Sequence, residues 1–382
     1  MDAKKLGRID FFEINQMKKH IFFFMGTTAE LIKLAPVIRE LKKRRIDFKV
    51  ITSGQTNVLF DNLTEYMGEI IPDIKFREKG KKSSLVLFAW WLMTTFLFAP
   101  ISLWKEFKGL NKKNSYFIIH GDTVSSLMGA LIAYFYGLRI IHVESGLRSF
   151  NFLEPFPEEI CRYIIIHLAD ILFAPTKWAF GNLKKLSGRK INTGQNTLIE
   201  TCQWALRTKK LPAIVKKYKR YYILTMHRQE HVIFRRDWTV ATIKYVIRNA
   251  PKNLNCILVT HHLTRRFFGN RKPIGQMWKR VRILKTLPYR DFMKLMENAE
   301  FIATDGCTNQ EEAYYMGLPL LALRNRTERI EGLDGNVVIS KSIKTVIKNF
   351  LKNYNNYRRK AADYKIRPSR IIVDFLVNNK IS

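Results

Sequence analysis

The chain has 382 residues, more than one hydrophobic core usually serves, and 47% of them are hydrophobic, which is enough for a sizeable core in each of two domains. The 66 Lys and Arg outnumber the 32 Asp and Glu and leave a net charge of +34, so the surface attracts polyanions such as nucleic acid, anionic lipid or phosphorylated substrates. The charge alone does not choose between these partners, and a generally basic proteome or a need for solubility would also explain it.

The four cysteines are widely spaced and contain no CxxC pair that would hold zinc, so no metal site is expected and a reducing, cytoplasmic setting is favoured. Residues 1–19 are predicted to form a polar leader, because they lack the apolar run and the small-residue cleavage site of a secretory signal. The basic residues are dispersed and no recognised nucleic-acid module is present, so no specific nucleic-acid partner is expected.

From residue 20 onward, short apolar runs alternate with longer helical patterns, which is typical of βαβ units and a mainly parallel sheet. We predict an N-terminal Rossmann-like domain at residues 20–200, with helices at Glu30–Arg44, Ser125–Tyr136 and Glu158–Ala169. Its predicted strands are His20–Met25, Phe48–Thr52, Tyr116–His120, Arg139–Val143 and Ile171–Ala174.

The segment Leu85–Trp104 interrupts this pattern, because it carries no charge for 20 residues and has lysines on both sides. Its length would allow a membrane span, but Pro100 and the neighbouring strands favour a helix that lies in the membrane interface. Trp90, Trp91 and Trp104 suit headgroup depth and the flanking lysines suit anionic lipid, so peripheral contact with the inner face of the membrane is expected. An ordinary buried core helix is the alternative.

A second series of βαβ units follows a basic, weakly patterned stretch, and we place the domain boundary near Leu198–Lys216. The C-terminal domain is predicted at residues 201–365, and residues 366–382 form a C-terminal segment that could cross back onto the first domain. The predicted helices are Asp237–Asn249, Tyr289–Asn298 and Asn309–Met316, and the predicted strands are Tyr221–Thr225, Cys256–Thr260, Arg282–Leu284, Phe301–Thr304 and Leu318–Leu323.

Polar residues just after each strand are candidate site residues, because ligands of open parallel sheets bind beyond the carboxyl ends of the strands. Gly26 follows the first strand at a turn where backbone N–H groups can bind phosphate. Asp122 and Glu144 each follow a strand. Glu158 and Glu159 begin a helix. Partly desolvated carboxylates at a sheet edge are candidates for proton transfer, although a helix cap or an ion pair explains each of them equally well.

The second half of the chain supplies candidates for binding a phosphorylated ligand. His227 follows a strand, and Gly306 and Thr308 precede a helix that carries Glu312. A glycine and hydroxyl turn at a helix N-terminus can bind a diphosphate, and a carboxylate on the helix can accept hydrogen bonds from ribose hydroxyls. Two arginines of the RTER segment can neutralise phosphate, namely Arg326 and Arg329.

Together these motifs resemble those of the UDP-N-acetylglucosamine 2-epimerase family, from about residue 20 to residue 340. The most specific part is the ordered block HGDT, HVESGLR and PFPEE, whose spacing is similar to that of the family. MHRQE, the DG…QEE helix start and the TER arginine follow in the family's order, and chance agreement of all six motifs is improbable.

The resemblance implies two Rossmann-like, doubly wound α/β domains of the glycosyltransferase B type, with a UDP-sugar in an interdomain cleft and UDP held by the C-terminal domain. The implied reaction interconverts UDP-GlcNAc and UDP-ManNAc for surface polysaccharide synthesis. It removes the C2 proton and expels UDP by anti elimination, and in a hydrolysing subgroup water intercepts the glycal intermediate. Inversion requires proton transfer at both faces of C2. No metal, nicotinamide or other cofactor is implied, and a homodimer is expected.

The resemblance also implies roles for individual residues. Glu312 matches the family's ribose-binding glutamate, and Arg329 matches its UDP-contacting arginine. The positions that match catalytic residues are Asp122, Glu144, Glu158 and His227, and those that match substrate-binding residues are Gly26, Lys33, Arg148, Arg162, Gly306, Thr308, Glu312 and Arg329.

Two loops depart from the family's pattern. The first loop usually reads GTRPE, but here Thr28 replaces the arginine, and Cys307 and Thr308 replace two glycines of the usual SGG turn. One lost charged contact weakens binding by roughly 1.5 to 3 kcal/mol. A membrane-associated glycosyltransferase, which moves the sugar to a lipid-linked or glycan acceptor, is therefore an alternative function. A nucleotide-sugar sensor without catalytic activity is a third.

Overall fold

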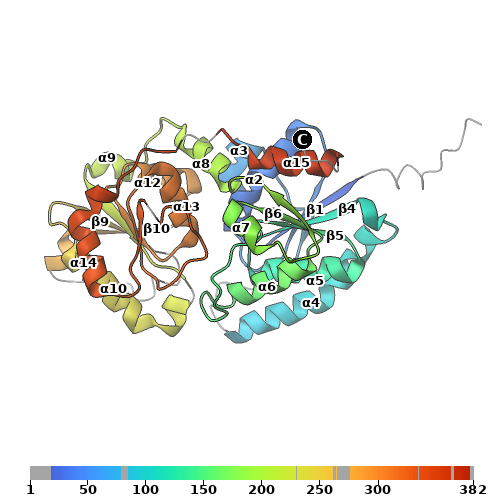
Figure 1. The fold of residues 1–382 in the computed structure, drawn as a ribbon, viewed down its shortest axis with the longest axis horizontal. Coiled ribbons are helices and arrows are strands. Elements are labelled where there is room, and N and C mark those ends of the chain that lie inside the picture. The colour runs from blue at the N-terminus through green and yellow to red at the C-terminus, as the bar shows by residue number, and fades with distance from the viewer. Residues whose placement is uncertain are drawn as a thin grey trace, which may run out of the picture. The chain divides into compact units, whose positions relative to one another are not determined.

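The computed structural model describes residues 19–78, 85–228, 230–260, 264, 276–333, 335–362 and 365–378. Except for Lys19, the predicted polar leader lies outside these residues. The contacts divide the chain into two compact units, the first formed by Met1–Leu198 with Ile366–Ser382 and the second by Ile199–Lys365. Each unit is a parallel sheet covered by helices, which confirms the prediction of two Rossmann-like α/β units (Figure 1).

The first unit contains a seven-stranded sheet in the order β3-β2-β1-β4-β5-β6-β7, and the registered strand pairs are all parallel. The order changes direction between β1 and β4, which is the point where ligands of such sheets bind. The strands are β1 (His20–Met25), β2 (Lys49–Thr52), β3 (Ile74–Lys75), β4 (Ser115–His120), β5 (Arg139–Val143), β6 (Ile171–Ala174) and β7 (Arg189–Asn192).

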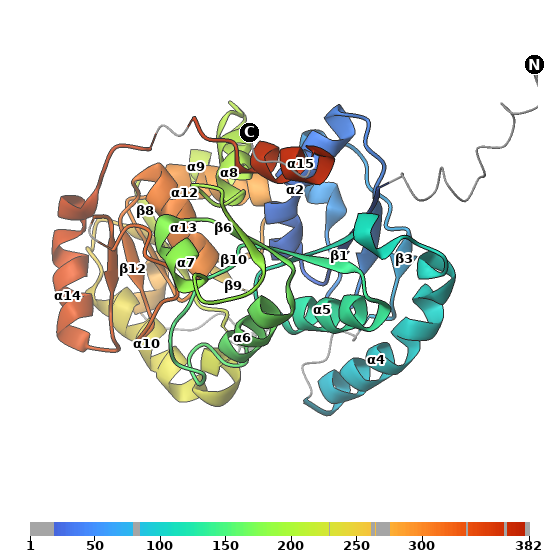
Figure 2. The same cartoon turned by 45° about the vertical axis from the view of Figure 1, so that its right-hand side comes forward.

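The helices of the first unit cover both faces of its sheet, which is why β1 and β4 are nearly continuous buried apolar runs. In Figure 1 and in the turned view of Figure 2, α4, α5 and α6 lie along one face, while α15 packs on α2 at the other. The helices are α2 (Thr28–Lys43), α3 (Thr64–Met67), α4 (Leu85–Phe107), α5 (Val124–Tyr136), α6 (Glu158–Leu168), α7 (Lys177–Asn182) and α15 (Pro368–Asn378), with the 3-10 turns η1 (Phe60–Leu63) and η2 (Lys112–Asn114). Helix α8 (Leu198–Leu206) begins at the last residue of this part of the unit and belongs otherwise to the second unit.

Local signals determine where these helices begin and end. Thr27 caps α2 by accepting a hydrogen bond from the Glu30 N–H, and the Glu30 carboxylate accepts one from the Thr27 N–H in return, which makes a capping box. Thr123 caps α5 by accepting a hydrogen bond from the Ser126 N–H, and Gly137 ends α5 in the left-handed conformation at φ +64. The loops before α2 and α5 are therefore fixed by hydrogen bonds of their own threonine side chains.

Helix α4 has the length and composition of a membrane span over Leu87–Phe107, with a mean hydropathy of 1.5. One face of it nevertheless packs on the core of the first unit. Trp91, Ala99, Leu103 and Phe107, which lie along one face, are at most 6% exposed. Side chains packed on protein cannot face lipid, so a helix surrounded by lipid does not fit this arrangement.

The packing of α4 corrects one prediction about its tryptophans. Trp91 is 3% exposed, and its Nε1–H donates to the Ser53 carbonyl at 3.1 Å, so the prediction that Trp91 lies at headgroup depth is wrong. Trp90 and Trp104 lie on the outer face and are 59% and 55% exposed. The two adjacent tryptophans point in different directions because successive residues of a helix are about 100° apart.

The second unit contains a six-stranded sheet in the order β10-β9-β8-β11-β12-β13, again with parallel pairs and a change of direction between β8 and β11. Its core is built from the apolar runs of β8 and β9 and from α10 and α14. The strands are β8 (Tyr221–Thr225), β9 (Asn255–Thr260), β10 (Val281–Lys285), β11 (Ile302–Thr304), β12 (Leu320–Ala322) and β13 (Val337–Ile339). The helices are α9 (Ala213–Lys217), η3 (Glu230–Phe234, a π-helix), α10 (Arg236–Asn249), η4 (Gln276–Arg280), α12 (Tyr289–Glu297), α13 (Cys307–Met316), α14 (Lys344–Asn353) and η5 (Tyr354–Tyr357).

Candidate functional site

In the first unit, two candidate carboxylates follow neighbouring strands of the sheet. Asp122 lies two residues beyond β4, and Glu144 directly follows β5. Because β4 and β5 pair in parallel, both carboxylates lie at the same edge of the sheet. Glu144 has a φ of +67, which residues other than glycine seldom adopt, and such strain is found most often at functional sites.

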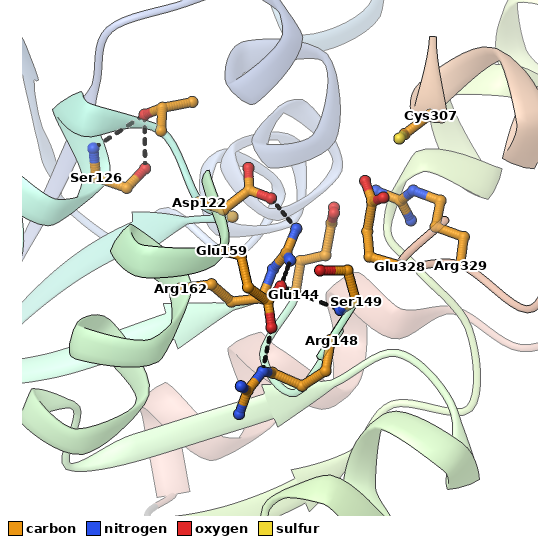
Figure 3. A network of polar contacts seen from close by, with 12 residues as sticks. Asp122, Ser126, Glu144, Arg148, Ser149, Glu159, Arg162, Cys307, Glu328 and Arg329 are labelled. Carbon is orange, nitrogen blue, oxygen red and sulfur yellow. Dashed lines mark hydrogen bonds and ion pairs between the residues drawn. The ribbon is translucent and has the colours of Figure 1, made fainter. Parts of the chain in front are cut away.

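Arg162 of α6 joins two carboxylates. Its guanidinium donates to Asp122 on one side and to Glu159 on the other, as Figure 3 shows. Glu159 also accepts from Arg148 Nε at 2.5 Å and from the Ser149 N–H at 3.0 Å. Since Arg162 and Glu159 are buried, this chain of alternating charges holds Asp122 and Arg148 in place.

Glu144 is the centre of a second buried group. Its Oε2 atom accepts hydrogen bonds from Lys33 Nζ at 2.6 Å and from Asn196 Nδ2 at 2.8 Å. His120 Nε2 lies 3.0 Å from the same oxygen. Lys33, predicted to bind substrate, therefore neutralises the charge of Glu144 in the interior of the unit.

Two buried groups lie close to the candidate carboxylates. Burial lowers the pKa of His142 to about 4; its hydrogen bond to the Gly121 carbonyl and the charge of Glu144 oppose this shift, while the charge of Arg162 adds to it. Burial raises the pKa of the Cys161 thiol to about 12, and the charges of Asp122 and Glu158 act in the same direction. Asp122 and Glu158 are thus neighbours of one thiol.

The structure corrects the role predicted for Gly26. Its N–H donates to Glu30 Oε2 at 2.6 Å, so the expectation that this group is presented to a phosphate is wrong. A Cβ atom at Gly26 would lie 2.3 Å from Ser125 Oγ and 2.5 Å from Ser53 Oγ. Gly26 is therefore required by the close packing of its turn against Ser53, which follows β2, and against the first turn of α5.

In the second unit, His227 follows β8 and Asp305 follows β11, the neighbouring strand. Asp305 is fully buried and accepts hydrogen bonds from the backbone N–H groups of His227 at 2.9 Å and Arg228 at 3.1 Å. Its second oxygen lies 3.0 Å from His231 Nδ1. Burial works to raise the pKa of Asp305, but the hydrogen bond with His231 and the charges of both histidines outweigh it and lower the pKa to about 2.

Two arginines meet at the start of α13. Arg324 Nη1 lies 2.5 Å from Cys307 Sγ, and the Arg228 guanidinium contacts the same sulfur. Burial raises the pKa of Cys307 to about 11, although both arginines act in the opposite direction. Guanidinium groups beside a helix N-terminus suit a phosphate. Arg326, which the sequence also suggested for phosphate, is exposed, whereas Arg324 is 1% exposed.

The remaining candidates of the second unit lie on α13 or contact it. Arg329 Nη1 donates to Glu311 at 2.5 Å, and both are buried. Glu312 is buried and accepts from Asn309 Nδ2 at 2.9 Å. Thr308 is half-buried in the first turn of the helix. Arg329 and Glu312, which the family resemblance assigns to UDP, thus already have partners within the protein.

Asn196, Asp305 and Arg324 belong to these networks but had received no role from the sequence, and Glu159, a candidate for proton transfer, instead pairs with Arg148 and Arg162. Asp305 directly follows a predicted strand, so the strand-end rule would have found it. Asn196 lies beyond β7, which was not predicted. Among the residues that the structure describes, no three His, Cys, Asp or Glu side chains are grouped as metal ligands would be.

Comparisons with known proteins agree with this arrangement. A family model described as UDP-N-acetylglucosamine 2-epimerase matches residues 106–370. A protein of Methanococcus maripaludis named UDP-N-acetylglucosamine 2-epimerase is 28% identical over 94% of this chain and 99% of its own.

Two solved structures are similar along most of the chain. One is a Methanocaldococcus jannaschii UDP-GlcNAc 2-epimerase in complex with UDP-GlcNAc and UDP, with a TM-score of 0.79, 27% identity and coverage of 94% of this chain and 99% of that one. The other is a Neisseria meningitidis UDP-GlcNAc 2-epimerase bound to UDP-GlcNAc, with a TM-score of 0.79, 26% identity and coverage of 94% and 100%. These relatives do not favour the alternative of a glycosyltransferase.

Proposed function

The chain belongs to the UDP-N-acetylglucosamine 2-epimerase family, and from that membership we propose that it interconverts UDP-GlcNAc and UDP-ManNAc to supply N-acetylmannosamine units for a surface polysaccharide. The observation that carries the proposal is that Asp122 and Glu144 follow two adjacent strands and that Arg162 of α6 binds Asp122, in a family with solved members bound to UDP-GlcNAc.

We assign the proton transfers of the reaction to residues of the first unit. A carboxylate removes the C2 proton of the sugar, the electron pair forms a C1–C2 double bond, and the bond from C1 to UDP breaks in the anti direction. A second acid delivers a proton to the opposite face of C2, and UDP adds back to C1. We assign these proton transfers to Asp122 and Glu144, which follow adjacent strands, and to Glu158 at the start of α6.

We assign the binding of the diphosphate and of the uridine to residues of the second unit. His227 and Arg228 stand at the end of β8, and Arg324 and Arg329 stand beside α13. Positive groups at a helix N-terminus stabilise both a bound diphosphate and the negative charge that develops on departing UDP. We also assign the ribose to Glu312 and the diphosphate turn to Gly306 and Thr308.

Isotope exchange tests the activity. Incubation with UDP-GlcNAc in deuterated water is expected to give UDP-ManNAc and to place deuterium at C2 of both sugars, as read by NMR and mass spectrometry. Asp122→Asn is expected to abolish both signals, whereas Glu106→Gln, which removes only a surface partner of Lys49, keeps them. If the wild-type protein produces neither exchange nor UDP-ManNAc, the proposal fails.

We further propose that the protein works in the cytoplasm as a peripheral membrane enzyme, with α4 lying in the interface. Opposite its buried face, α4 exposes a ridge of large apolar side chains without a charge between them. Lys105 and Lys108 are exposed at its end, so an anionic bilayer complements both the ridge and its border. The ridge comprises Leu87, Trp90, Met93, Phe96, Leu97, Phe98, Ile101 and Trp104.

Vesicle binding tests this contact. The double variant Trp90→Ser/Ile101→Ser is expected to release the protein from vesicles that contain phosphatidylglycerol. Ile343→Ser, which changes a 46% exposed side chain of the second unit, is expected to leave binding intact. Cosedimentation of the double variant at the wild-type level would reject the membrane contact.

A homodimer is part of the same proposal, and we place its contact on α6. Tyr163 and Ile164 are 42% and 36% exposed there, and Phe152 packs edge-to-face on Tyr163 with ring centroids 5.5 Å apart. Light scattering is expected to give twice the mass of the chain, and Tyr163→Asp is expected to give the monomer mass. If the α4 double variant instead becomes monomeric, the α4 ridge is the subunit contact and the membrane proposal is wrong.

A further inference from the structure

Asp305 contacts both the backbone and a side chain of the segment that follows β8. Its Oδ1 atom accepts the His227 N–H at 2.9 Å and lies 3.5 Å from Nδ1 of the same histidine. Its Oδ2 atom accepts the Arg228 N–H at 3.1 Å. The carboxylate therefore holds both the backbone and the ring of His227.

The other side of the His227 ring is bounded by Gly306. A Cβ atom at Gly306 would lie 2.7 Å from His227 Cε1 and 3.3 Å from Nε2, so the ring rests against the glycine backbone. The His227 side chain is 40% exposed, whereas Asp305 is not exposed at all. The ring is thus held between a buried charge and a glycine, with Nε2 as the nitrogen turned away from Asp305.

We propose that Asp305 is the positioning residue of His227, which directs Nδ1–H toward its carboxylate and so presents Nε2 to the diphosphate end of the substrate. A carboxylate in this position selects one tautomer and stabilises the protonated imidazole when charge develops on departing UDP. The inference rests on the proposed epimerase function for its kinetic consequence but not for its geometry.

His231 provides the comparison that separates this role from simple structural support. Its Nδ1 lies 3.0 Å from Asp305 Oδ2, and its ring lies 4.9 Å from that of Trp238 in the interior of the unit. Both histidines use the same carboxylate, but only His227 is exposed enough to meet a ligand. Loss of the carboxylate therefore affects both rings, whereas a change of His231 affects the structural one alone.

The test combines kinetics with NMR of the whole protein. Asp305→Asn is expected to lower kcat for UDP-GlcNAc epimerisation by about 100-fold and to leave KM within about twofold, because the lost interaction acts in the transition state. In the same variant the ring ¹⁵N signals of His227 are expected to show a weaker preference for the Nδ1–H tautomer, because an amide oxygen is a poorer acceptor than the carboxylate. His231→Gln is expected to lower kcat less than tenfold.

If Asp305→Asn does not fold, a second variant still tests the proposal. Gly306→Ala leaves the carboxylate intact but displaces the ring, and it is expected to lower kcat with little change in thermal stability. The proposal is overturned if the tautomer balance of His227 is unchanged in Asp305→Asn, or if Asp305→Asn lowers kcat equally in wild-type and His227→Gln backgrounds. An inactive wild-type protein would reject the epimerase function, while the ¹⁵N signals of the His227 ring would still decide the relation between Asp305 and His227.

Discussion

Lys33 Nζ lies 2.6 Å from Glu144 Oε2, and the two side chains are only 7% and 5% exposed. The ion pair joins α2 to the end of β5, 111 residues further along the chain. Each partner alone would be an uncompensated charge in the interior, so the pair connects the stability of the first unit with the charge of a proposed catalytic carboxylate.

Lys33→Met is expected to destabilise the first unit by about 3 to 5 kcal/mol, because it leaves the Glu144 carboxylate buried without its cation. Urea denaturation followed by fluorescence measures the loss. The double variant Lys33→Met/Glu144→Gln is expected to recover part of it, since the amide carries no charge. Additive losses in the double variant would contradict the coupling of the two residues.

Arg162→Lys is expected to lower kcat/KM for epimerisation by about 100-fold or more, because one ammonium group cannot bridge Asp122 and Glu159 as the guanidinium does. Arg44 offers a matched control, since it also bridges two carboxylates, Glu40 at 2.8 Å and Asp374 at 2.5 Å, but on the surface. Arg44→Lys is expected to keep kcat/KM within about twofold. Equal losses in the two variants would mean that Arg162 has no special role.

His142 predicts a dependence of stability on pH. Burial lowers its pKa to about 4 in the folded protein, below the value of about 6.5 in the unfolded chain. Its contribution is therefore complete above pH 6.5 and is lost as the pH falls toward 4, because the unfolded chain binds the proton more readily. The loss is about 3 kcal/mol in total. Urea titrations at several pH values are expected to show a shallower decline for His142→Gln than for the wild type.

The cysteines predict slow alkylation of the folded protein. Burial raises the pKa of Cys161 and Cys256 to about 12 and that of Cys307 to about 11, so few thiolates are present near pH 8. Iodoacetamide at pH 8, followed by intact-mass spectrometry, is expected to label the native protein far more slowly than the urea-unfolded chain. Labelling of Cys307 at the unfolded rate would show that its thiol is not shielded.

Much of the fold could be predicted from local patterns. The predictions for β1, β5, β6 and β8 match the observed bounds, because each is a short apolar run between turn residues. Three strands were missed, namely β3, β7 and β13. They have two to four residues, and β3 and β7 include polar or charged ones, so they become strands only by pairing at or near the edge of a sheet.

The site was predictable only as a set of positions. The strand-end rule found Asp122, Glu144 and His227, since chain order and parallel pairing bring such residues to one sheet edge. It did not show that the Gly26 N–H donates a hydrogen bond to the Glu30 carboxylate. The catalytic and binding roles of the named residues remain predictions for the experiments above.

The sequence by itself determined the two α/β units and the family, because apolar periodicity and ordered motifs depend on near neighbours along the chain. Only the tertiary structure decided the partners of the charges. Glu144 pairs with Lys33 and Arg162 bridges Asp122 and Glu159, and these contacts join elements far apart in sequence. Packing likewise decided that Trp91 is buried and Trp90 is exposed. An uncharged helix has apolar side chains on every face, so the elements packed beside it determine which face is buried.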